Sequence, residues 1–184
     1  MRVSTALAIA MLFVGAAEAA PTRLTVCIDA IPDSAMVTLS TLEASAIYAA
    51  IGIRIQWRTT GSHCRADAIW ISLLEHTPVE FRPGTMAYAL PYEGTHIQVF
   101  YDRISVRPLG VRQHILGYVL AHEIGHVLQR IARHSAEGVM KASWSDEDYK
   151  LMLRSRLKFT PTDIELIHAG LEVRAAGTLL AKRN

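Results

Sequence analysis

Residues 120–144, LAHEIGHVLQRIARHSAEGVMKASW, contain three of the chain's eight histidines, and this segment decides how the rest of the sequence is interpreted. His122 and His126 are four residues apart, and His134 follows eight residues later. A four-residue offset on an α-helix places two side chains on the same face, one turn apart. Both imidazoles can then bind one ion, and His134, beyond the expected end of the helix, can supply a third ligand if the chain folds back.

Glu123 is rotated by about 100° from His122 around the helix axis, so its carboxylate lies beside a bound ion rather than on it. A catalytic zinc site has three protein ligands and one open position. Zinc held by three neutral imidazoles keeps its double charge and lowers the pKa of a water molecule from about 15.7 toward about 7. The segment therefore predicts a Zn²⁺ site whose ligands are His122, His126 and His134. Glu123 is the expected base, which takes a proton from the attacking water and returns it to the leaving amine of an amide.

The HExxH pattern also occurs by chance in helices, and the alternative is that His122 and His126 are surface or capping residues. That alternative leaves unexplained the acid beside them on a strongly apolar helix, expected over residues 111–130. Zinc binding is favoured because the pattern lies inside a periodic helix and is followed by a third histidine.

The same residues resemble the zinc-binding region of the metzincin clan of metallopeptidases. In that clan a third zinc histidine follows HExxH, and a methionine-containing turn lies under the metal. His122, Glu123 and His126 match the helix motif, and His134 matches the third ligand in role. Met140, in GVM, resembles the Met-turn; its alternative is a buried loop methionine that fills a gap. The resemblance implies a zinc peptidase that acts on polypeptides.

A narrower likeness, to small exported bacterial matrixin-like proteins, is carried by AHEIGHVL, RHSAEGVMKASW and VFYDRI. It extends from about residue 24 to the C-terminal helix. The usual spacing, HExxHxxGxxH, would put glycine at Gln129 and the third histidine at Ala132, two residues earlier than it stands here. The chain must leave the helix without the usual glycine, at Arg130 or after another turn. Ala142 stands where some relatives have a metal-binding tyrosine.

Hydrophobic periodicity predicts an α+β fold, with a mixed twisted sheet formed mostly by the N-terminal half. Strands are expected within residues 24–29, 53–57, 68–74, 84–90 and 95–104. Helices are expected over residues 34–51 and 111–130, and after the caps Ser145 and Thr160. The resemblance implies a metzincin-like single domain, in which the edge strand that pairs with substrate comes from residues 84–101. The sequence leaves open which of the two strands there is outermost. It also leaves open which tyrosine, Tyr88, Tyr101 or Tyr149, would stabilise an oxyanion.

Residues 1–20 have the layout of a secretory signal peptide: Arg2, an apolar run over residues 6–17, and small residues before the cut. The run is shorter than the roughly 20 apolar residues that span a bilayer. We therefore expect residues 21–184 to form one secreted or periplasmic domain. Oxidising surroundings favour a disulfide between Cys27 and Cys64, which would close a loop of about 38 residues and contribute roughly 4 kcal/mol. The alternative is two buried free thiols.

The formal net charge of +2, from 19 basic and 17 acidic residues, is too balanced to indicate binding to nucleic acid or to an anionic membrane. No membrane association is expected after signal cleavage, and a polypeptide substrate is the expected partner. The sequence gives no indication of the oligomeric state.

The sequence favours a zinc-dependent endopeptidase, but two other functions stay open. One is a catalytically inert binding protein that zinc stabilises. Glu123 argues against it, since a structural site needs only ligands. The other is a zinc hydrolase of another amide bond, such as one in the cell wall.

Overall fold

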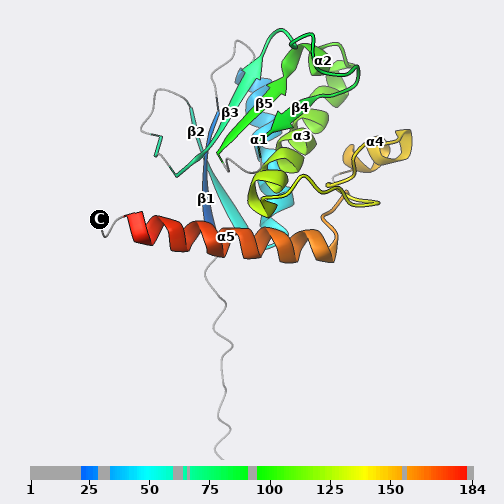
Figure 1. Cartoon of the computed structure of the whole chain (residues 1–184). Coiled ribbons are helices and arrows are strands. Elements are labelled where there is room, and N and C mark those ends of the chain that lie inside the picture. Colours follow the sequence, from blue (N-terminus) through cyan, green and yellow to red (C-terminus); the bar gives the residue numbers. More distant parts are fainter. Residues whose placement is uncertain are drawn as a thin grey trace, which may run out of the picture.

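A mixed five-stranded sheet with helices packed on it forms the part of the chain that the computed structural model describes, residues 22–28, 34–59, 64–65, 67–90, 95–154 and 157–181 (Figure 1). The elements, in chain order, are β1 (Thr22–Ile28), α1 (Ser34–Ala49), β2 (Ile53–Thr59), β3 (Ile69–Leu74), β4 (Ala87–Ala89), β5 (His96–Phe100), α2 (Tyr101–Ser105), α3 (Leu109–Gln129), α4 (Asp146–Met152) and α5 (Pro161–Ala181). The expected α+β fold is confirmed. The predicted signal peptide lies outside the described residues.

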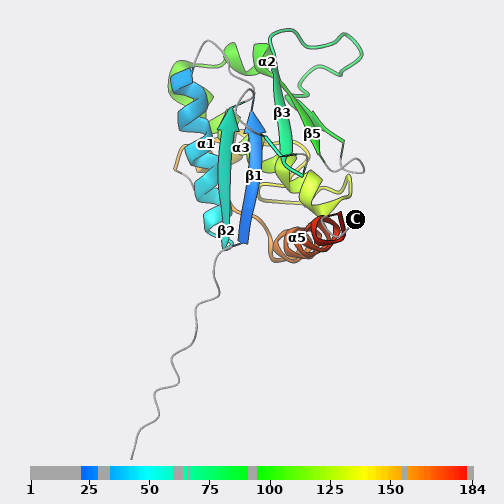
Figure 2. The ribbon, with the colours of Figure 1, turned by 90° about the vertical axis from the view of Figure 1, so that its left-hand side faces the viewer.

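The sheet has the strand order β2-β1-β3-β5-β4. Strands β2, β1, β3 and β5 are parallel to one another, whereas β4 runs antiparallel to β5. Helices α1 and α3 pack together on one face of the sheet, and α5 runs across the end of α3 (Figures 1 and 2). This order resolves the question that the sequence left open, because β4 is the outermost strand.

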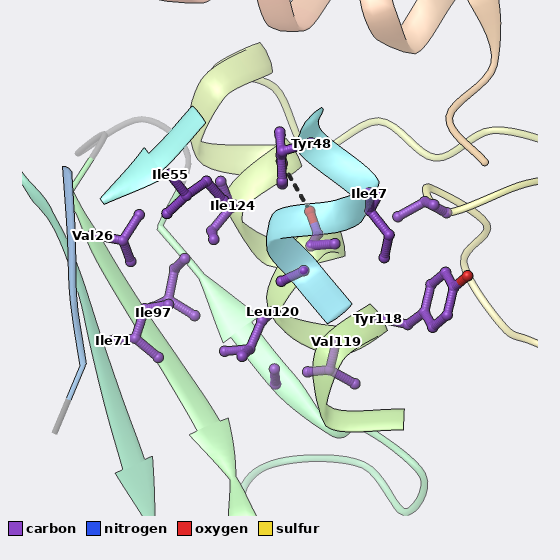
Figure 3. Packing of buried hydrophobic residues seen from close by; sticks show 14 of the residues in the cluster. Val26, Ile47, Tyr48, Ile55, Ile71, Ile97, Tyr118, Val119, Leu120 and Ile124 are labelled. Carbon is purple, nitrogen blue, oxygen red and sulfur yellow. Dashed lines mark hydrogen bonds between the residues drawn. The ribbon is translucent and has the colours of Figure 1, made fainter. Parts of the chain in front are cut away.

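Alternation along the strands decides which side chains enter the core. In β2, Ile53 and Ile55 are buried, and Arg54 between them is exposed. Figure 3 shows apolar residues of the sheet facing those of α1 and α3: Val26, Ile55, Ile71, Ile97, Ile47, Leu120 and Ile124. The hydroxyl of buried Tyr48 in α1 donates to the carbonyl oxygen of Ala121 at 2.9 Å. This bond fixes α3 beside His122.

The expected strand over residues 95–104 is wrong in its second half, because Tyr101–Ser105 form the short helix α2. The carboxylate of Asp102 accepts hydrogen bonds from the backbone nitrogen and the hydroxyl of Thr77, at 3.1 and 2.7 Å. Ile104 is fully buried. These contacts turn the chain away from the sheet toward α3.

A disulfide joins Cys27, buried in β1, to Cys64, with 6.3 Å between the two Cα atoms. The expected pairing is confirmed. It connects β1 to the segment between β2 and β3. In the described part of the chain, none of the helices has the length and apolar character needed to cross a membrane.

The packing of α5 on α3 depends on Gly170. A Cβ atom at this position would lie only 1.6 Å from the carbonyl oxygen of Leu128. We therefore expect Gly170→Ala to push α5 away and to lower the free energy of unfolding by about 3 kcal/mol. Gly177→Ala, in the same helix with nothing within 4 Å of its Cβ, is the matched control and should raise stability by about 0.5–1 kcal/mol. Urea denaturation measures both changes, and equal effects at the two positions would contradict the assigned contact.

Candidate metal centre

Three imidazoles converge at one point beside α3. The Nε2 atom of His126 lies 3.0 Å from Nε2 of His122 and 3.3 Å from Nε2 of His134. One nitrogen from each ring lies within 4.8 Å of the others. Ligands about 2.0–2.1 Å from a tetrahedral zinc ion are about 3.3 Å apart, so the spacing fits one ion after a small adjustment. The structure thus brings together the three histidines that the sequence singled out.

The second nitrogen of two of these rings is held by a backbone carbonyl. His122 donates from Nδ1 to the oxygen of Val139 at 2.8 Å, and His126 donates from Nδ1 to the oxygen of Ile131 at 3.3 Å. A carbonyl only accepts, so the proton of each neutral ring is on Nδ1, and Nε2 carries the lone pair. Metal-binding histidines are oriented in this way.

The surroundings keep the imidazoles uncharged. Burial lowers the pKa of His122 to about 3, and the neighbouring His126 acts in the same direction. Burial also lowers the pKa of His126 to about 4, together with the effect of His134. At neutral pH these rings are therefore in the form that binds a metal.

Glu123 lies buried next to the histidines and lines the same cleft. Burial raises the pKa of its carboxyl group to about 8, and the backbone amide of Ala89 in β4 acts in the opposite direction. Without a cation nearby this carboxyl group is largely protonated at pH 7. A cation beside it would favour the ionised form, which is the form that accepts a proton.

The chain leaves α3 through a left-handed residue. Arg130 has φ 58° and ψ 25°, and its backbone nitrogen donates to the oxygen of His126 at 2.9 Å. It is the single non-glycine residue with positive φ in the described part of the chain. The helix therefore ends at the first of the two places that the sequence allowed, and the chain returns to place His134 beside the other two rings.

Met140 is fully buried under this part of α3. A Cβ atom at Gly125 would lie 2.6 Å from its sulfur atom, so the methionine packs where the helix has no side chain. The carbonyl oxygen of Met140 accepts a hydrogen bond from the nitrogen of Ser135 at 2.8 Å, which closes the loop that follows α3. The Met-turn role stays a prediction.

Asp163 of α5 anchors the loop that carries His134, and sequence analysis missed this role. Its fully buried carboxylate accepts hydrogen bonds from Nη1 of Arg133 at 2.8 Å and from Oγ of Ser135 at 2.6 Å. Thr160 donates to it from its nitrogen and its hydroxyl, at 3.0 and 2.7 Å. Burial alone would raise the pKa of Asp163, but the hydrogen bonds from Ser135, Thr160 and Arg133 outweigh burial and lower it.

Trp144 is a second residue that the sequence did not single out. Its ring lies 5.5 Å from the ring of His122, edge to face, and its Nε1 donates to the oxygen of Gly138 at 3.4 Å. It limits the movement of the His122 ring from the side of the cleft.

The histidines and Glu123 open into a cleft of about 630 Å³. Its lining includes residues 82–89, which comprise β4 and the loop before it, and residues 141–144 from the loop after Met140. Tyr88 and Tyr149 also line the cleft, whereas the hydroxyl of Tyr101 donates to the sulfur of Met36. The edge strand and the histidine cluster therefore face the same cleft.

We expect Asp163→Asn to weaken zinc binding by about 10- to 100-fold, because the charged anchor of the His134 loop is lost. The free energy of unfolding should also fall by about 2 kcal/mol. Titration against a competing chelator and urea denaturation measure the two effects. Asp146→Asn, an exposed acid at the start of α4, is the matched control and should change neither. Wild-type zinc affinity in Asp163→Asn would show that the anchor is unnecessary.

The metal-free protein should be most stable near pH 6.5, because below that value the losses at two histidines outweigh the gain at Glu123, and above it the loss at Glu123 dominates. The folded-state pKa values of His122 and His126 lie below 6.5, so the stability they contribute is lost as the pH falls from 6.5 toward 4 and 3. The pKa of Glu123, about 8, lies above its ordinary 4.5, so its contribution is present below pH 4.5 and is lost as the pH rises through 8.

Urea denaturation of EDTA-treated protein at pH 6.5 and pH 8 tests the alkaline side. Between these values the wild type should lose about 2 kcal/mol relative to Glu123→Gln, because the histidines affect both proteins alike. The same loss in both proteins would assign it to another group.

The comparisons with known proteins bear on the fold. No family model matches the chain, and no curated protein matches its sequence. The crystal structure of archaemetzincin from Methanopyrus kandleri is similar, with a TM-score of 0.54 and 15% sequence identity over 84% of this chain and 97% of that chain. The expected fold class is thereby confirmed, and the chain has a metzincin-like fold.

Proposed function

We propose that this chain is a secreted or periplasmic zinc-dependent metalloendopeptidase. The observation that carries the proposal is the convergence of the His122, His126 and His134 side chains beside the buried carboxyl group of Glu123. The metzincin-like fold and the cleft along an edge strand support it. The Cys27–Cys64 disulfide supports export of residues 21–184 after removal of a signal peptide at residues 1–20.

The donor set suits zinc. Three neutral imidazoles, two with Nδ1 held by carbonyl oxygens, make a three-ligand site that leaves a coordination position open. When bound, zinc would polarise the scissile carbonyl group and lower the pKa of water. His122, His126 and His134 would hold it, and Met140 would support the helix from below.

Glu123 supplies the proton transfers. Its carboxylate takes the proton of the attacking water and delivers it to the nitrogen of the leaving amine. The open edge of β4, Ala87–Ala89, borders the same cleft and can pair with an extended peptide by adding a strand to the sheet. A polypeptide substrate is therefore the best fit to the cleft.

The test combines metal content with proteolysis. The wild type and Glu123→Gln should each bind one zinc ion per chain, and His134→Ala should lose most of it. Glu123→Gln should lower kcat for cleavage of an unfolded protein by about 10³-fold, because the general base is removed. Glu147→Gln, an exposed acid in α4, is the matched control and should keep full activity.

The outcomes separate the competing functions. Equal cleavage by the wild type and Glu123→Gln would overturn the assigned base. Zinc binding without cleavage of any amide would favour an inert binding protein. Cleavage of peptidoglycan fragments but not of unfolded proteins would favour a hydrolase of a cell-wall amide.

A further inference from the structure

The charged side chains of the cleft are mostly basic. Besides the histidines, those that line it are Arg82, Arg107, Lys141 and Glu123. Among the described residues Glu123 is the one carboxylate of the lining. A cation in the histidine site would add to the positive charge.

Lys141 is neutralised from within the protein. Its Nζ lies 2.5 Å from a carboxylate oxygen of Asp148. Burial would raise the pKa of Asp148, but the hydrogen bonds from Lys141 and Ser145 outweigh it and keep the pKa low. No carboxylate of the described residues lies within ion-pair distance of Arg82 or Arg107. Arg82 and Arg107 are therefore two cations of the cleft that can each bind an anionic group of a ligand.

Contacts with neighbouring residues hold the backbone at Arg82 and the side chain of Arg107 in place. Arg103 of α2 donates to the carbonyl oxygens of Arg82, at 2.7 Å, and of Thr85, at 2.5 Å, which fixes the loop before β4. The guanidinium group of Arg107 lies over the ring of Tyr149, 5.9 Å from its centre. A guanidinium group stacked on an aromatic ring still presents its N–H groups at the edge, where they can bind a carboxylate in bidentate fashion.

The backbone of Arg107 lies at the N-terminal end of α3, whereas His122 and His126 lie in the C-terminal half of that helix. It precedes the first residue of α3, and His122 comes 13 residues after that start, which corresponds to about 20 Å along the helix axis. An extended peptide advances about 3.3 Å per residue. The residue that reaches Arg107 is therefore a few positions away from the scissile bond.

We propose that Arg107, stacked on Tyr149, binds an acidic side chain of the peptide substrate, and that Arg82 adds to the preference for acidic peptides. The proposal rests on the peptidase function proposed above and names its substrate class. The peptide that fills the cleft excludes water from around the pair, which strengthens the attraction between the two charges relative to a pair on an open surface.

The experiment uses the zinc-loaded protein and pairs of peptides that are otherwise uncharged. One peptide of each pair has Glu and the other has Gln at the same position, and this position is moved along both sides of the cleaved bond. At one position the wild type should cleave the Glu peptide about tenfold more efficiently, as kcat/KM, than the Gln peptide. Arg107→Gln should bring this ratio close to one, Arg107→Lys should keep part of it, and Arg107→Glu should favour Lys at the same position. Arg54→Gln, on the exposed side of β2 at the other edge of the sheet, should keep the full ratio.

Calorimetry with zinc-loaded Glu123→Gln measures binding independently of cleavage. The Glu peptide should bind about tenfold more tightly than the Gln peptide, less so at high salt, and Arg107→Gln in the same background should remove the difference. Equal cleavage and binding of the Glu and Gln peptides at every position, or an unchanged ratio in Arg107→Gln, would overturn the proposal. Selective binding of the Glu peptide without cleavage by the wild type would support the Arg107 site for an acidic side chain and overturn the peptidase function instead.

Discussion

A buried carboxylate on one helix controls the geometry at the end of another. Helix α3 fixes His122 and His126 relative to each other, but the third imidazole stands on a loop. Asp163 of α5 binds the residues on both sides of His134, and the same carboxylate accepts two hydrogen bonds from Thr160 at the start of α5. Charge-assisted hydrogen bonds to a group shielded from water are strong and directional. The position of the third ring is thus a property of the α3–α5 packing as much as of the loop.

The rest of the fold offsets the free-energy cost of burying the polar side chains of α3. Two imidazoles and a carboxyl group of this helix are buried, and burial disfavours the charged form of each. The apolar faces of the sheet and α1 compensate, with Tyr48 bound to the backbone one residue before His122. Groups with strongly shifted pKa values that gather in a cleft are typical of functional sites. The stability of the core therefore keeps His122, His126 and Glu123 buried beside one another.

Local patterns were enough for most of the fold, because alternation in strands, periodicity in helices and cap residues are features of short windows. They failed at Tyr101–Ser105, where contacts with Thr77, more than 20 residues away, decide the conformation. The histidine spacing likewise identified the cluster. The cap that starts α5 was recognised from residues 160–163, but its link to the loop of His134 was not. That link joins residues about 30 positions apart, and no local pattern encodes it.

The left-handed Arg130 has a consequence for how relatives of this chain should be sought. A motif written as letters at set intervals requires a glycine and a histidine at positions that Gln129 and Ala132 occupy here. The backbone makes the same kind of exit one step later without glycine, and the longer return still delivers an imidazole to the same point. A search for distant relatives should therefore compare where the helix ends and which histidine returns to its face, and should not require a fixed sequence motif.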